Sequence, residues 1–415
     1  MSIPYHCRIC DHAYEPVVSF GPMPLANGFL SADQFADEYL FDLAAAYCPH
    51  CGMFQLIEQP APERMFNNQY AFYSGTSRSM AQHFQRLAEQ VEQDYLSAPD
   101  PLVVELGSND GILLQYFARQ GRRHVGVEPS RNVAEVARQK GITVWGEFFD
   151  EALARRIVAA HGQADVILAA NVMCHISNLH SVVAGFKSLL KPEGVVIFED
   201  PYLGDVIAHT TYDQIYDEHV FLFSVLSIKF LFEQHGLELF NIEPQPTHGG
   251  SMRYFFGHAG RRPTSERVAQ QIRLEQALGL SELATYARFQ GNCELFRARL
   301  RRLLEGVRRQ GKRVVGYAAT SKSTTLLNYC GITSKEIEFI SDTTPIKQGK
   351  FSPGMHIPVH PPEKFRAAYP DYALLFAYNH RIEIMAKEQV FGDSGGRWIV
   401  YAPEIQILQQ DVSDG

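Results

Sequence analysis

The chain has 415 residues, of which 46% are hydrophobic and 20% are charged, and its formal net charge is −8. A chain of this length folds as two or three domains, and the composition is that of a globular protein rather than a disordered one. The acidic balance gives no reason to expect nucleic acid or an anionic membrane as a partner. No apolar run is long enough to span a membrane and no secretory leader is recognisable, so we expect a cytoplasmic protein.

Four of the seven cysteines lie in two CxxC pairs near the N-terminus. The pairs read CRIC and CPHC, and 37 residues separate them. Two such turns aim four thiolates at one tetrahedral Zn²⁺, and a four-thiolate set leaves no open position for catalysis. His6, His12 and His50 lie close by in the sequence and are competing ligands. We predict a structural zinc site whose ligands are Cys7, Cys10, Cys48 and Cys51.

Strands and helices alternate from residue 102 onward, in the pattern of a parallel, doubly wound α/β sheet. The apolar strand Leu102–Leu106 runs into the loop ELGSNDG, and a second strand ends at Glu128. Two more apolar strands, DVILAANV and GVVIFEDP, follow, and the segment GLELFNIEPQPTHGGSMRYFFGHAG predicts a closing antiparallel pair. In such a sheet, ligands bind at the carboxyl ends of the parallel strands.

The loop ELGSNDG lacks the GxGxxG dinucleotide pattern and resembles the first motif of class I S-adenosylmethionine methyltransferases. This resemblance implies that Gly107 lets the backbone approach the amino-acid part of the cofactor. It also implies that Glu128 accepts hydrogen bonds from both ribose hydroxyls and that Phe148 lies beside the adenine. The candidate cofactor-binding residues are Glu105, Gly107, Asn109, Asp110, Glu128, Phe148 and Asn171.

The segment Tyr212–His219, YDQIYDEH, carries six ionisable side chains in eight residues. Methylation of a carbon beside a ketone needs a base for a weakly acidic proton and donors for the enolate oxygen. His219 is the candidate base, and Glu218 is expected to orient it or to bind a sugar hydroxyl. Tyr216, with His175 from NVMCHISN, is expected to donate to the developing charge. A solvated loop with a capping acid is the alternative interpretation.

The last third of the chain begins with a charged helical stretch and continues with a second strand–helix alternation. Its arginine-rich helix is expected to present a solvated face. Ser321, Lys322 and Ser323 stand at a predicted helix N-terminus, where backbone N–H groups and the helix dipole favour phosphate. Lys322 is the first candidate ligand for a diphosphate and Lys347 the second. A purely structural domain with surface lysines is the alternative.

Taken together, the CxxC pairs and the motifs YSGTS, ELGSNDG, YDEHVFLFS and HGGSMR resemble the sugar C-methyltransferases that act on nucleotide-linked 4-keto deoxyhexoses. The resemblance extends over essentially the whole chain. It implies a zinc-binding module (1–66), an S-adenosylmethionine domain (67–262), and a helical linker with a C-terminal Rossmann-like domain (263–415). It also implies proton removal at C3, alpha to the C4 ketone, followed by methylation of that carbon in branched-chain sugar biosynthesis.

The same resemblance assigns roles residue by residue. His219 matches the base, and Tyr216, Glu218 and His175 match the other active-site side chains. Tyr70 matches an aromatic residue that closes over the sugar, and Tyr73 is its companion.

The sequence departs from the family pattern in two places. Where the family commonly has YHEHF, this chain has Asp217 and Val220, and we expect Asp217 to raise the pKa of His219 or to alter substrate preference. The usual glycines of the first loop in the C-terminal domain are partly replaced by Ala318, Ala319 and Ser323. The nucleotide contact at that loop therefore stays open.

Two other functions remain as alternatives. An O- or N-methyltransferase of another small molecule would use the same cofactor without needing enolate donors. A zinc-ribbon RNA-binding methyltransferase would need a basic surface, which the acidic composition does not favour. The nucleotide carrier (dTDP or GDP), the sugar substituents, the stereochemistry and the oligomeric state are not specified by the sequence.

Overall fold

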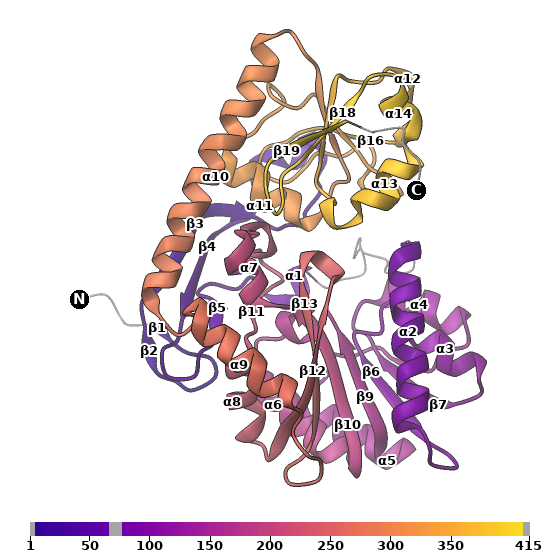
Figure 1. Cartoon of the computed structure of the whole chain (residues 1–415). Coiled ribbons are helices and arrows are strands. Elements are labelled where there is room, and N and C mark those ends of the chain that lie inside the picture. The colour runs from indigo at the N-terminus through magenta and orange to yellow at the C-terminus, as the bar shows by residue number, and fades with distance from the viewer. Residues whose placement is uncertain (1–4, 66–76, 410–415) are drawn as a thin grey trace.

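The computed structural model of the chain describes residues 5–65 and 77–409, and it consists of three units (Figure 1). The N-terminal unit contains a two-stranded ribbon and a four-stranded antiparallel sheet in the order β11-β5-β4-β3. Its strands are β1 (Tyr5–His6), β2 (Ala13–Tyr14), β3 (Pro16–Pro24), β4 (Leu40–Tyr47) and β5 (Phe54–Leu56), and the short helices η1 (Ala32–Asp37) and α1 (Pro62–Met65) accompany them. The fourth strand of this sheet, β11 (Phe221–Leu222), comes from the middle of the chain.

The middle unit is built on a seven-stranded sheet in the order β12-β13-β10-β9-β6-β7-β8. Its strands are β6 (Leu102–Leu106), β7 (Arg123–Val127), β8 (Val144–Trp145), β9 (Ala164–Ala170), β10 (Leu190–Pro201), β12 (Leu237–Gln245) and β13 (Ser251–His258). The first five run parallel, and β13 joins β10 and β12 by antiparallel pairing, which confirms the predicted closing pair.

Helices cover both faces of this sheet (Figure 1). They are α2 (Arg78–Tyr95), α3 (Leu114–Arg119), α4 (Arg131–Gln139), α5 (Glu151–His161), α6 (Leu179–Leu189) and α8 (Val225–Glu233). Helix α7 (Leu203–His209) lies beyond the strand ends and packs into the core shared with the N- and C-terminal units (Figure 1). The short turns η3 (Met173–His175), η4 (Tyr212–Gln214) and η5 (Thr247–Gly249) complete the unit. The β6 and β9 strands are almost entirely buried, as expected for parallel strands covered on both faces, whereas β7 is buried only over its last three residues.

The C-terminal unit is a second α/β sheet in the order β16-β15-β14-β17-β18-β19. Counted from β14, this is the strand order 3-2-1-4-5-6 of dinucleotide-binding folds, with an antiparallel last strand. Its strands are β14 (Val314–Tyr317), β15 (Ile340–Ser341), β16 (Val359–His360), β17 (Tyr372–Leu375), β18 (Arg397–Val400) and β19 (Gln406–Gln409). Its helices are α11 (Ser321–Cys330), η6 (Pro345–Lys347), α12 (Pro362–Ala367), η7 (Tyr378–His380), α13 (Arg381–Lys387) and α14 (Gln389–Asp393).

Two helices link the middle and C-terminal units. They are α9 (Glu266–Leu278) and the long α10 (Leu283–Arg309), which runs past β3 to the C-terminal unit (Figure 1). The arginines of α10 lie largely on an exposed face, as expected for a solvated helix. Within the described ranges 5–65 and 77–409, no helix has the length and apolar character needed to cross a membrane.

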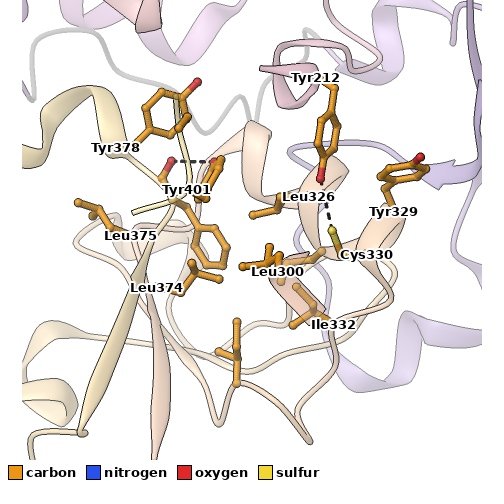
Figure 2. Close-up of a cluster of buried hydrophobic side chains, with 14 of the residues drawn as sticks. Tyr212, Leu300, Leu326, Tyr329, Cys330, Ile332, Leu374, Leu375, Tyr378 and Tyr401 are labelled. Carbon is orange, nitrogen blue, oxygen red and sulfur yellow. Dashed lines mark hydrogen bonds between the residues drawn. The ribbon is translucent and has the colours of Figure 1, made fainter. Parts of the chain in front are cut away.

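The N-terminal unit belongs to two hydrophobic cores at once. Its β3 and β4 side chains pack with α10, α11 and the C-terminal sheet, whereas its cysteine ribbon packs against the middle sheet. Figure 2 shows part of the first core, where Tyr212 from the middle unit lies beside Tyr329 and Cys330 of α11. The Tyr212 hydroxyl lies 3.3 Å from the Cys330 sulfur. The acid/base segment 212–219 therefore begins inside this shared core.

Candidate active site

A single cavity of about 1020 Å³ brings most of the predicted site residues together. This volume suits two ligands side by side, because a pocket for one drug-sized molecule is typically ~300–1,000 Å³. The cavity is lined by the carboxyl ends of β6, β7 and β9, by segment 212–219, and by the loops at α11 and η6. Predicted residues in the lining are Gly107, Asn109, Glu128, Phe148, Asn171, His175, Tyr216, Glu218, His219, Lys322 and Lys347. Tyr70 and Tyr73 lie outside the described residues.

Glu128 directly follows β7, and its carboxylate is a hydrogen-bond acceptor in the lining of the cavity. Its two carboxylate oxygens accept hydrogen bonds from the backbone N–H groups of Asn109 (3.0 Å) and Ser130 (2.8 Å). Burial raises the pKa of Glu128, and these two hydrogen bonds oppose that rise. The carboxylate is therefore fixed at the cavity wall, where its remaining lone pairs suit a diol such as a ribose.

Position 107 requires a glycine for two reasons, its backbone conformation and the lack of space for a Cβ atom. Its φ is +61°, in the left-handed region, and a Cβ there would stand 2.1 Å from a methyl carbon of Val172. A glycine thus lets the loop after β6 pass against the loop after β9. This close passage leaves the backbone of the loop open to the cavity.

Glu105 and Asp110 lie behind this loop rather than in the cavity lining. Lys140 Nζ donates to the Asp110 carbonyl oxygen (2.7 Å) and approaches its carboxylate (3.3 Å). Burial raises the pKa of Glu105 well above its ordinary value. Both side chains support the loop from behind, and their role in cofactor binding stays a prediction.

His219 lines the cavity, and both of its ring nitrogens have partners. Nδ1 donates to the backbone carbonyl of Gln214 (2.7 Å), which leaves the lone pair on Nε2. Nε2 in turn accepts from the Tyr216 hydroxyl at 2.7 Å. The Gln214 carbonyl thus selects the tautomer in which Nε2 can take a proton.

The environment of His219 favours its neutral form. Burial lowers its pKa well below the usual 6.5, and the neighbouring His175 lowers it further. The rings of His175 and His219 lie 5.2 Å apart, and burial also lowers the pKa of His175, to about 4. Both imidazoles are therefore uncharged at neutral pH, and His219 is available to accept a proton.

The expected effect of Asp217 on His219 is wrong. One Asp217 carboxylate oxygen accepts from the backbone N–H of Ala26 (2.9 Å) in the N-terminal unit. Burial, followed by the charge of Glu218, raises the pKa of Asp217 itself, so it carries less negative charge than its sequence position suggests. The pKa of His219 is lowered rather than raised.

The N-terminal unit reaches the cavity through Asn27. Its amide donates to Glu218 (2.7 Å) and to the Ser321 hydroxyl (2.9 Å), so that one side chain joins the acid/base segment to the start of α11. Thr325 of α11 also donates to the Ile215 carbonyl (3.0 Å). Segment 212–219 is thereby held by all three units of the chain.

Lys322 is a buried cation in the cavity lining. Its Nζ donates to the His248 carbonyl (3.1 Å) and lies 4.8 Å from the ring centre of Tyr378. Burial lowers the pKa of Lys322 to about 8, with Asp213 opposing the shift. It follows Ser321 at the N-terminus of α11, as predicted. A buried ammonium group at a helix N-terminus favours an anionic ligand.

Lys347 also lines the cavity, but its ammonium group has a structural partner. Its Nζ donates to the Ala319 carbonyl (2.8 Å), while Asp342 accepts from the Ala319 N–H (2.6 Å). The two charges hold the loop between β14 and α11, in which Ala318 adopts a left-handed φ of +68°. In dinucleotide-binding folds the acid at this place binds ribose. Here Asp342 holds the protein's own backbone.

The four paired cysteines form the predicted cluster. Cys7 and Cys51 have sulfurs 3.5 Å apart, as do Cys10 and Cys48, and all four sulfurs lie within 4.8 Å of one another. A tetrahedral zinc site with Zn–S bonds of 2.3 Å places its sulfurs roughly 3.8 Å apart, so the thiols fit this metal. No histidine joins this group among the described residues. The remaining Cys174, Cys293 and Cys330 are buried, as expected.

Sequence reasoning missed several residues of the site. The Gln214 carbonyl is a backbone group, and Asn27 lies in no recognisable motif. His248 opens the motif HGGSMR, but sequence reasoning assigned it no role in the site. The spacing between Asn27 and Glu218 exceeds any local pattern. Only the strand-end rule for Rossmann-like sheets could have pointed to Asp342, which directly follows β15.

Comparisons with known proteins agree with this architecture. Three families match in chain order: a zinc binding domain (7–66), a methyltransferase domain (73–242) and a C-methyltransferase C-terminal domain (246–403). A ubiquinone biosynthesis O-methyltransferase of Ralstonia nicotianae is 33% identical over 114 residues, 25% of this chain and 47% of that protein. The structure of magnesium protoporphyrin IX methyltransferase (ChlM) from Synechocystis with bound S-adenosylmethionine aligns at 15% identity, covering 43% of this chain and 79% of that one, with a TM-score of 0.34.

One relative matches nearly from end to end. The C-methyltransferase NovU of Streptomyces niveus is 37% identical over 409 residues, which cover 98% of this chain and 97% of that protein. The match includes the cysteine cluster, the methyltransferase sheet and the C-terminal unit. The chain therefore belongs to the C-methyltransferase family, as an S-adenosylmethionine-dependent enzyme with a zinc-binding module.

Proposed function

We propose that the enzyme methylates C3 of a nucleotide-linked 4-keto deoxyhexose, in branched-chain sugar biosynthesis. The observation that carries this proposal is the His219–Tyr216 pair in the lining of a cavity large enough for two ligands, with the tautomer of His219 set by the Gln214 carbonyl. A neutral base beside a hydroxyl donor suits removal of a proton alpha to a ketone. Transfer to a hydroxyl or amine would not require that combination.

In this proposal the sugar nucleotide lies between segment 212–219 and the C-terminal unit. Lys322 and the N-terminus of α11 bind the diphosphate, and Lys347 holds the loop that forms this site. Tyr216 and His175 donate hydrogen bonds to the ketone oxygen as it gains negative charge. His219 Nε2 accepts the C3 proton, and the Gln214 carbonyl stabilises the imidazolium that forms.

Bound S-adenosylmethionine supplies the methyl group from its sulfonium centre. Glu128 binds the ribose hydroxyls, the loop at Gly107 and Asn109 accommodates the amino-acid part, and Phe148 and Asn171 line the adenosyl end. Glu218, held by Asn27, binds a sugar hydroxyl. These residues bring the two reactants together, which contributes to the rate by alignment.

Replacing Glu128 should weaken cofactor binding. We expect Glu128→Ala to raise the Kd for S-adenosylmethionine roughly 30–150-fold, because hydrogen bonds to a charged group contribute about 2–3 kcal/mol. Glu128→Gln, which keeps one acceptor oxygen, should fall between this variant and the wild type. Isothermal titration calorimetry measures the constants, and Glu135→Gln on the exposed face of α4 is the control. An unchanged Kd for Glu128→Ala would remove Glu128 from the cofactor site.

The KM for the sugar nucleotide should depend on pH in the alkaline range, because Lys322 loses its charge there. The pKa of Lys322 is about 8, so its charge is present below that pH and is lost above it. We therefore expect KM for the sugar nucleotide to rise above pH 8. The acid side should stay flat down to at least pH 6.5, because burial keeps His219 neutral there. In Lys322→Arg, whose guanidinium stays charged, the alkaline rise should disappear; a rise at the same pH would contradict the diphosphate role.

Substrate identity is tested by presenting a panel of dTDP- and GDP-linked 4-keto-6-deoxy sugars with S-adenosylmethionine. We expect at least one of them to yield a product whose new methyl group is attached to carbon, as read by mass spectrometry and NMR. A methyl group on oxygen or nitrogen would contradict the proposal. If no sugar is methylated, S-adenosylmethionine binding is measured on the same sample. Binding without methylation would show that the substrate class is wrong, and absence of binding would show that the preparation is inactive.

A further inference from the structure

A second metal-capable cluster lies at the wall of the cavity, apart from the four paired cysteines, with two histidines in the lining and a buried thiol behind them. The Cys174 sulfur and one ring nitrogen each of His175 and His219 lie within 4.8 Å of one another. Cys174 and His175 come from η3, at the carboxyl end of β9, and His219 comes from segment 212–219. A movement of about 1 Å would bring these three donor atoms to the separations that ligand atoms have from one another in a tetrahedral zinc site.

His219 already has the outer hydrogen bond that a metal-binding histidine needs. Its Nδ1–H donates to the Gln214 carbonyl, as ligating histidines commonly donate their second N–H to a carbonyl or carboxylate. The lone pair on Nε2 is the coordinating atom, and it now accepts from the Tyr216 hydroxyl. A metal ion would replace that hydroxyl hydrogen as the partner of Nε2.

The surroundings of Cys174 also favour a cation. The thiol is fully buried, and besides burial the charges of Asp200 and Glu218 raise its pKa well above the ordinary value. The charge of Glu218 would stabilise a positive ion held at the thiol, whereas burial raises the pKa of Asp200 to about 8, so that Asp200 is largely protonated at neutral pH. Lys322 is the opposing charge, since its positive charge lowers the pKa of His219. His175 and His219 line the cavity, so an ion in solution can reach the cluster.

We propose that Cys174, His175 and His219 form an inhibitory transition-metal site that takes Zn²⁺, with its fourth position open to the cavity. One sulfur and two imidazole nitrogens match the ligand preference of this ion. Binding forms a Zn–S bond and releases the thiol proton to solvent. Nε2 of His219 cannot coordinate zinc and accept the C3 proton at once, so the bound ion stops turnover. This inference goes beyond the proposed function, because metal binding needs neither substrate nor cofactor.

Metal binding itself is the first test. Enzyme carrying one zinc per chain in the four-cysteine site is titrated with Co²⁺, which reports thiolate coordination by charge-transfer absorption. We expect one further equivalent to bind with such a band, and Cys174→Ala to lose both the band and the additional equivalent. Cys293→Ala, which removes a buried thiol outside the cavity, should bind as the wild type does. A wild-type enzyme that binds no second ion would overturn the proposal, whatever the substrate is.

Inhibition is the second test, on an active substrate. Half-inhibition of Cys174→Ala should need at least about tenfold more free Zn²⁺ than half-inhibition of the wild type, because loss of even an outer-shell partner costs ~10–100-fold in metal affinity and Cys174 is a direct ligand. Chelation of the added zinc should restore wild-type turnover. Cys174 does not line the cavity, so its loss should leave turnover without added zinc close to normal. Equal zinc sensitivity in the two enzymes would contradict the assignment.

Discussion

The variant His219→Asn should lose roughly 10²–10⁴-fold in turnover, the range attributed to a positioned general base. The asparagine amide can keep the hydrogen bond to the Gln214 carbonyl, but it offers no nitrogen lone pair to the substrate. Both methylation and exchange of the C3 proton with solvent should fall together. The Kd for S-adenosylmethionine should stay near that of the wild type, since Glu128 and the Gly107 loop are unchanged.

A matched control for this experiment is His209→Asn, at the exposed end of α7. It removes an imidazole close in sequence without touching the Tyr216 pair, and its turnover should be unchanged. If His219→Asn kept full turnover, the base would have to be another residue. If it lost methylation but kept exchange, His219 would act after proton removal and not in it.

Loss of the zinc ligands should have the largest effect on stability. We expect Cys48→Ser to lose zinc and to lower the free energy of unfolding by on the order of 5 kcal/mol, because metal binding is coupled to folding. The effect should extend to activity. The sheet beside the cluster includes β11, which lies two residues after His219, and the Leu56 N–H donates to Val220 (2.8 Å). Zinc content by mass spectrometry and chemical denaturation measure the two effects.

The control for the zinc ligand is Cys293→Ala, a buried thiol on α10 outside the cluster. It should keep one zinc per chain and lose only about 1–2 kcal/mol, as expected for a small buried truncation. Equal destabilisation by the two variants would show that Cys48 contributes by packing alone. Unchanged zinc content in Cys48→Ser would contradict its role as a ligand.

Most of the fold could be predicted because its signals are local. The two CxxC turns carry their geometry within four residues each, and the apolar strands of the middle unit alternate with helices at regular spacing. The start of α11 could be placed in the same way, from Thr320 and the serines that follow it. Such features depend on neighbours in sequence.

The site itself was harder to predict because it is assembled from distant segments. The two-residue strand β11 has no periodicity, so nothing in the sequence indicated that it completes the sheet of the N-terminal unit. Asp217 is two residues from His219, yet its side chain accepts a hydrogen bond from the Ala26 N–H. Sequence proximity therefore gave the wrong direction for the pKa shift of His219. The tautomer of His219 depends on a backbone carbonyl, which no residue type encodes.

The central claim, carbon methylation through an enolate, is tested most directly by solvent exchange. The enzyme is incubated in deuterated water with a 4-keto-6-deoxy sugar nucleotide that it methylates, once without and once with S-adenosylmethionine. We expect incorporation of one deuterium at C3 without cofactor, dependent on His219, and a methyl group on the same carbon when cofactor is added. A methylated product that carries its new group on oxygen or nitrogen, with no exchange at C3, would contradict it.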